Sequence, residues 1–104
     1  MNSHLLTDLK ALLKLLRAKS RWTQGAMAKN KLGVTVKPRS PNAVCWCLTG
    51  GMRKIAPRNS GRYLNMRQAL RNESLCSIED YNDTNFHYKI VDLIKTVISY
   101  QLKP

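Results

Sequence analysis

Lysine and arginine side chains recur at spacings of three and four through the first two thirds of the chain, where they could bind a negatively charged partner. The candidate contacts form one group near the N-terminus and a second group after residue 50: Lys10, Lys14, Arg17 and Arg21, then Arg53, Lys54, Arg58, Arg62, Arg67 and Arg71. Most of them are arginine, whose planar guanidinium donates two parallel hydrogen bonds to a phosphate. These positions predict a surface for a polyanion, in the first place nucleic acid.

The acidic residues are distributed in the opposite way. Residues 1–72 contain fifteen Lys and Arg and a single acid, Asp8, whereas residues 73–104 contain three Lys and five acids. A net charge of +12 on 104 residues repels itself and destabilises the folded chain. An anionic partner would offset this repulsion. A basic surface that is merely solvated is the alternative interpretation.

The mode of binding follows from what the sequence lacks. No helix-turn-helix, zinc-finger spacing or aromatic ribonucleoprotein motif is evident. We therefore expect contacts with phosphates rather than base-specific readout. If about six phosphates of duplex DNA are neutralised, the logarithm of the binding constant falls with the logarithm of salt concentration at a slope of about −5.

A cysteine-dependent reaction is a weaker hypothesis. Cys47 with His87, and Asp83 or Asn82 behind it, would supply a nucleophile, a base and an orienting group. Asp83 already has a sufficient role as an expected helix cap, so the sequence favours a protein that is not an enzyme.

Metal and cofactor binding are not expected either. The three cysteines, at positions 45, 47 and 76, form no CxxC pair with which His87 could complete a zinc site. Reduced, buried thiols are the expected state of cysteines in a cytosolic protein.

Hydrophobic periodicity predicts the elements that position these side chains. Leu5, Leu9, Leu12 and Leu16 form one apolar stripe of an expected helix over residues 4–21, which places its lysines and arginines on the other side. Further helices are expected over residues 23–32, from 40 to 50 or onward to 55, over 60–72, and from about 85 to 102. Residues 33–39 are expected to be extended. The predicted fold is one all-α domain over residues 1–104, with four or five helices and the first and last helices as the main walls of the core.

Local signals set the expected helix boundaries. Thr23 is an expected N-cap, with Trp22 packing on Met27 as a hydrophobic staple. Ser40-Pro41 predicts a helix start, and Gly50-Gly51 offers a C-cap. Residues 77–80 have the spacing of a capping box, and residues 82–84 are expected to cap the last helix.

Membrane insertion is not expected. No stretch approaches the roughly 20 apolar residues that span a bilayer. The N-terminal residues lack the basic, apolar and small-residue order of a secretory signal. We expect a cytoplasmic protein.

Three landmarks stand out as short motifs: Trp22-Thr-Gln-Gly25 with Ala28, Ala43 with Cys47 and Gly50-Gly51, and Tyr81-Asn82-Asp83. Over roughly residues 10–100 the chain resembles an uncharacterised family of small proteins from bacteria and their phages. That family usually has Ala where Gly51 stands and Trp where Tyr81 stands. The resemblance implies a compact helical fold and no particular activity, and the cationic helix faces are not part of its pattern.

These observations together favour a small non-catalytic protein that binds nucleic acid or the machinery that handles it. By analogy with the phage-like family, a host-takeover or anti-defence factor fits such a protein. The alternative is an inhibitor whose arginine-rich face docks on an acidic patch of a host protein.

Overall fold

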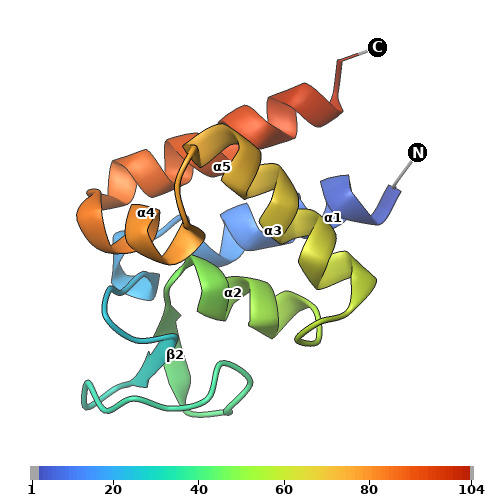
Figure 1. Ribbon diagram of the computed structural model, residues 1–104. Coiled ribbons are helices and arrows are strands. Elements are labelled where there is room, and N and C mark those ends of the chain that lie inside the picture. Colours follow the sequence, from blue (N-terminus) through green and yellow to red (C-terminus); the bar gives the residue numbers. More distant parts are fainter. Residues whose placement is uncertain (1–2, 104) are drawn as a thin grey trace.

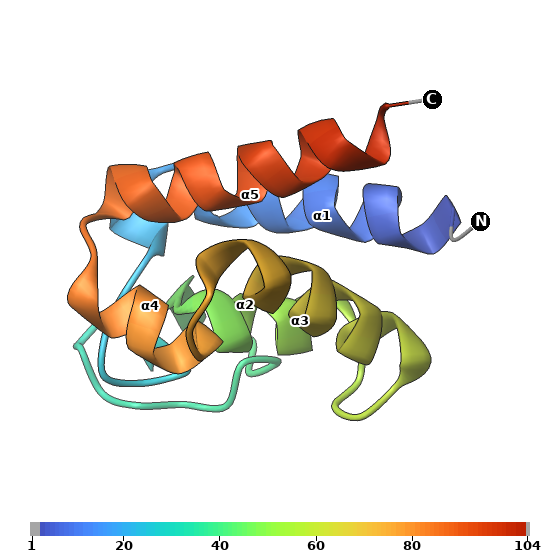
Figure 2. The ribbon, with the colours of Figure 1, turned by 45° about the horizontal axis from the view of Figure 1, so that its top comes forward.

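Two long helices from opposite ends of the chain pack side by side. The computed structural model describes residues 3–103, in which α1 spans Ser3–Leu16 and α5 spans His87–Gln101. Figure 2 shows them as one layer, in which the start of α1 and the end of α5 lie at the same end. The buried faces of both helices are aliphatic: Leu9, Leu12 and Leu16 in α1, and Ile90, Leu93, Ile94, Val97 and Ile98 in α5. The prediction that the first and last helices form walls of the core is confirmed.

Three further helices form the second layer below this pair. They are α2 (Leu48–Ile55), α3 (Gly61–Ser74) and α4 (Ile78–Thr84) (Figures 1 and 2). Met52, Met66 and Leu70 are fully buried and close the core from this side. Among residues 3–103, every helix is too short or too polar to cross a bilayer.

The all-α prediction is wrong in one segment. Strands β1 (Ala28–Asn30) and β2 (Ala43–Trp46) pair antiparallel in a two-stranded sheet, with Ala28 opposite Trp46. The helix expected over 23–32 therefore does not form, and the helix expected from Ser40 begins only at Leu48. The helix expected over 4–21 ends at Leu16 and is followed by a short 3-10 turn, η1 (Lys19–Arg21).

The Ser40-Pro41 signal makes a turn instead of a helix. The backbone N–H of Asn42 donates to Oγ of Ser40 at 3.2 Å, and that of Ala43 donates to the Ser40 carbonyl at 3.1 Å. The chain then becomes extended because β2 has a partner strand in β1. Trp46, at the end of β2, is 5% exposed and donates its indole N–H to the Pro38 carbonyl.

The glycine pair lies inside α2 and does not end a helix. Both glycines are buried, and a Cβ on Gly50 would lie 1.8 Å from the carbonyl oxygen of Met27. The N–H of Cys47 donates to the same carbonyl at 3.2 Å. Glycine is therefore required at Gly50 because the β1 side of the chain approaches the helix backbone. The alternative end of this helix, at Ile55, is the one observed.

The caps of the last two helices differ from each other. Oγ of Ser77 accepts from the N–H of Asp80 at 3.0 Å, which confirms the serine half of the predicted capping box; no range was predicted for the helix that it begins, α4. The prediction that residues 82–84 cap the last helix is wrong, because α4 continues through Thr84. Phe86 takes the N-cap position of α5 without a side-chain hydrogen bond.

Candidate anion-binding surface

The cations of α1 lie on its exposed side, as predicted. Lys10 and Lys14 lie on α1, Arg17 directly follows its last residue, and all three are exposed. Arg21 is exposed in η1. Within residues 3–103, none of these four side chains forms an ion pair with a carboxylate. We call Lys10, Lys14 and Arg17 the α1 strip.

Arg62 is held by the one acid of the N-terminal two thirds. Its Nη2 lies 2.6 Å from Oδ1 of Asp8, and its Nε donates to Oδ2 at 3.0 Å. The Asp8 side chain is 2% exposed, so this bidentate pair compensates a buried charge. Hydrogen bonding to the Asp8 carboxylate raises the pKa of Arg62. Arg62 was predicted as a partner contact; its side chain is 46% exposed, and its guanidinium is paired within the protein.

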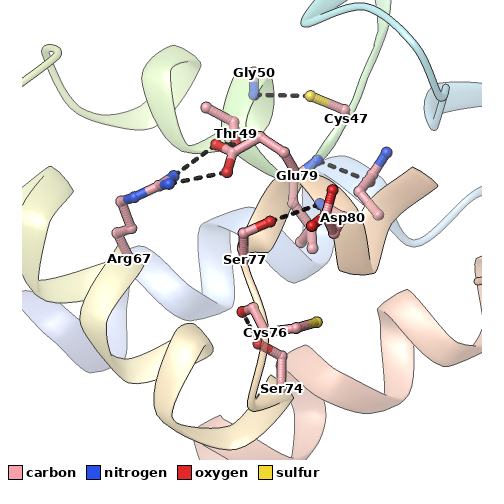
Figure 3. Close-up of polar contacts among 11 residues, drawn as sticks. Cys47, Thr49, Gly50, Arg67, Ser74, Cys76, Ser77, Glu79 and Asp80 are labelled. Atoms are coloured by element: carbon pink, nitrogen blue, oxygen red, sulfur yellow. Dashed lines mark hydrogen bonds and ion pairs between the residues drawn. The ribbon is translucent and has the colours of Figure 1, made fainter. Parts of the chain in front are cut away.

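Arg67 is likewise paired within the protein. Its two terminal nitrogens donate to the carboxylate of Glu79 at 2.8 and 2.9 Å, and Thr49 donates to Glu79 Oε2 at 2.8 Å (Figure 3). The hydrogen bonds from Arg67 lower the pKa of Glu79 to about 2, although partial burial acts against them. This ion pair joins α3 to α4.

Two cations of the group after residue 50 line a hollow together with two cations that were not predicted. Arg53 and Arg58 line a hollow of about 460 Å³ with Lys37 and Arg39, and Pro38 and Pro57 complete its walls. We call this hollow the basic groove. Lys37 and Arg39 were missed because they lie in an extended segment without helical periodicity. Their charge and the absence of nearby acids in the sequence were the available signal.

The remaining two predicted cations lie apart from the groove lining. The Lys54 ammonium lies 6.0 Å from the ring centroid of Trp46. Arg71 is exposed near the end of α3. The ten predicted cations thus fall into the α1 strip, the basic groove, two internal ion pairs and isolated positions.

A polar network around the buried Asn82 joins two of the three sequence landmarks. Asn82 is 1% exposed, and its Oδ1 accepts from the indole N–H of Trp22 at 2.8 Å. Gln24 donates to the carbonyls of Asn82 and Asn85, both at 3.0 Å. The N–H of Gly25 donates to Oδ1 of Asp83 at 3.2 Å. These hydrogen bonds replace the predicted staple between Trp22 and Met27, and they make the landmarks a structural joint between η1 and α4.

Another hollow lies next to this joint, at the start of α5. Its volume is about 550 Å³, and its lining includes Lys19, Trp22 and His87. Phe86 and Tyr88 stack at its edge with centroids 6.2 Å apart, and both are exposed. The sequence did not indicate this aromatic pair.

Of the residues of the cysteine-enzyme hypothesis, Cys47, Asn82 and Asp83 line one hollow of about 200 Å³, whereas His87 is not among its lining residues. The sulfur of Cys47 caps α2 by accepting from the N–H of Gly50 at 3.3 Å (Figure 3), and burial raises the pKa of the thiol. Asp83 lies near enough to raise that pKa further. His87 instead places Nε2 2.7 Å from the Leu16 carbonyl and lines the hollow beside Trp22, which Cys47 does not line.

The cysteines are free thiols, of which Cys47 is buried and Cys45 and Cys76 are half-buried. Cys45 lies in β2 and Cys47 follows that strand, so neither is in the helix that the sequence predicted. Within residues 3–103, no three His, Cys, Asp or Glu side chains are placed to hold a metal ion.

Comparison with known proteins gives no matching family model, no matching curated protein and no matching solved structure. The resemblance of the three landmarks to a bacterial and phage family therefore stays a prediction.

Proposed function

We propose that this protein binds nucleic acid through phosphate contacts, without catalysing a reaction. One observation carries the proposal. Of the fifteen lysines and arginines before residue 73, all but Arg62 and Arg67 lack a carboxylate partner among the described residues. Charges left unpaired in this number repel one another unless an anion lies against them.

The α1 strip has the dimensions of a phosphate contact. Lys10 and Lys14 span about 6 Å along α1, and Arg17, directly after the helix, extends the strip to about 10 Å. One strand of duplex DNA carries a phosphate about every 3.4 Å along its axis, so the strip covers about three phosphates. The strip carries two lysines and one arginine, which bind phosphate irrespective of the neighbouring base.

The test is a reversal of charge on the strip. The double variant Lys14→Glu/Arg17→Glu should lose most of its affinity for random DNA and RNA in a mobility-shift assay. The matched control is Lys89→Glu/Lys95→Glu, which makes the same change of charge on exposed positions of α5. In wild-type protein, affinity should fall steeply between about 50 and about 200 mM salt. Equal affinity of the two variants would contradict the assignment of the strip.

A protein partner with an acidic surface is the second candidate, and an apolar patch favours it. Leu32 and Val34, in the loop after β1, are 85% and 56% exposed, and they lie beside the exposed Lys31. Apolar residues next to cations are typical of a protein interface and are not needed for phosphate contacts. Leu32→Ser/Val34→Ser should weaken binding to such a partner and leave retention on heparin unchanged.

A further inference from the structure

The basic groove combines four cations with no acidic residue in its lining. Lys37 and Arg39 come from the loop before β2, Arg53 comes from α2, and Arg58 follows that helix. Two of the six lining residues, Pro38 and Pro57, are prolines, whose fixed φ angle restricts both walls. Four like charges at one hollow are unfavourable without an anion between them.

Hydrogen bonds hold the two walls together. Nε of Arg39 donates to the carbonyl of Arg53 at 2.9 Å, which ties the loop to α2. Trp46 donates to the carbonyl of Pro38 at 2.9 Å, which ties the same loop to β2. The loop therefore cannot move away to separate Arg39 from Arg53 without losing these bonds.

One buried donor of Arg53 lacks an acceptor. Its Nε is buried and has no hydrogen-bond partner among the described residues. Its side chain also borders a second hollow, which shares Lys37 and Pro38 with the basic groove. A buried donor without an acceptor is unfavourable, so a small shift of Arg53 toward an oxyanion would gain hydrogen bonds and lose none to another side chain.

We propose that the basic groove binds a phosphate monoester dianion. A terminal phosphate carries nearly two negative charges at neutral pH, whereas an internal phosphodiester carries one, so four cations favour the terminal group. The forked guanidiniums of Arg39, Arg53 and Arg58 suit its tetrahedral oxygens. The inference rests on the proposed function for the source of this phosphate, the end of a nucleic-acid strand, and free phosphate is the other source of the same chemistry.

The experiment compares two oligonucleotides of one sequence, with a 5′-phosphate or a 5′-hydroxyl, in phosphate-free buffer. Wild-type protein should bind the phosphorylated strand about tenfold more tightly. Arg39→Gln/Arg53→Gln should remove this preference. The control Lys10→Gln/Lys14→Gln should weaken both strands equally and keep the preference. Arg58→Gln serves as a second groove variant that disturbs no hydrogen bond between the walls, and circular dichroism checks each fold.

A titration with inorganic phosphate, followed by backbone amide shifts in NMR, separates this inference from the proposed function. Shifts around Arg39 and Arg53 without binding of either oligonucleotide would support the groove and contradict the proposed function. Equal affinity of wild-type protein for both strands, with no phosphate-induced shifts at the groove, would overturn the inference. In that case the proposed function would still be decided by the variants of the α1 strip.

Discussion

The indole N–H of Trp22 donates to Oδ1 of Asn82 at 2.8 Å, although 60 residues separate them in the sequence. The same oxygen accepts from the N–H of Leu48 at 3.0 Å, and the Asn82 amide donates to the Thr23 carbonyl at 3.0 Å. One buried side chain thus connects the segment after η1, the start of α2 and the helix α4.

Asn82→Ala should destabilise the protein by about 3 kcal/mol, because it leaves several buried donors and acceptors without partners. Urea denaturation measures the change. Asn72→Ala is the matched control, since Asn72 is exposed on α3 and accepts one bond from the exposed Gln68. A loss of stability no larger than in the control would show that the network is dispensable.

The sequence predicted those helices well in which apolar residues at helical spacing form one buried face. The periodic aliphatic residues of α5 and the serine cap of α4 act within a few residues, so local chemistry decides them. The predicted separation of leucines from cations on α1 is also local, because residues three and four apart share a face. These features are confirmed in the structure.

The segment between Trp22 and Cys47 could not be predicted in the same way. Its conformation depends on partners distant in sequence, such as Asn82 for Trp22 and strand β1 for β2. Tertiary hydrogen bonds here outweigh the helix signals of Thr23 and Ser40. The basic groove was not predicted for the same reason: its residues come from a loop and from the end of α2, which are distant in sequence.

Gly50→Ala should destabilise the fold by about 3 kcal/mol, because the new methyl group would overlap the Met27 carbonyl. The clash is with backbone on both sides, so no side-chain rotation relieves it. Gly61→Ala is the control: it begins α3 with nothing within 4 Å of the added Cβ, and alanine favours a helix by up to about 1 kcal/mol. Thermal unfolding of both variants checks the prediction, and a stable Gly50→Ala would contradict the close approach.

The ion pair of Arg67 and Glu79 should make stability depend on acid pH. The pKa of Glu79 is lowered from 4.5 to about 2 in the folded state, so its contribution is complete above pH 4.5 and is lost as the pH falls toward 2. Because the side chain is half exposed, we expect a contribution of about 1 kcal/mol. Glu79→Gln should therefore lose less stability than wild type on acidification from about pH 6 to about pH 3. Asp92→Asn, at an exposed position of α5, should behave as wild type.

Cys47 should be the least reactive of the three thiols. Burial, together with the nearby charge of Asp83, raises the pKa of Cys47, so little thiolate is present at neutral pH. Iodoacetamide should label the half-buried Cys45 and Cys76 first, as peptide mass spectrometry would show. All three should react alike in denaturant. Preferential labelling of Cys47 in the folded protein would instead favour the cysteine-dependent enzyme.

Substitution by glutamine should affect stability at Arg62 and binding at Arg58, although the two arginines are four residues apart and both were predicted as partner contacts. Arg62→Gln leaves the carboxylate of Asp8, 2% exposed, without its charged partner, so it should lower the midpoint of urea denaturation. Arg58 lines the basic groove, so Arg58→Gln should leave that midpoint unchanged and weaken binding to 5′-phosphorylated DNA. Each variant removes one positive charge, so net charge alone would weaken binding equally in both. If binding falls equally and stability does not change in either, the division between internal ion pairs and partner contacts is wrong.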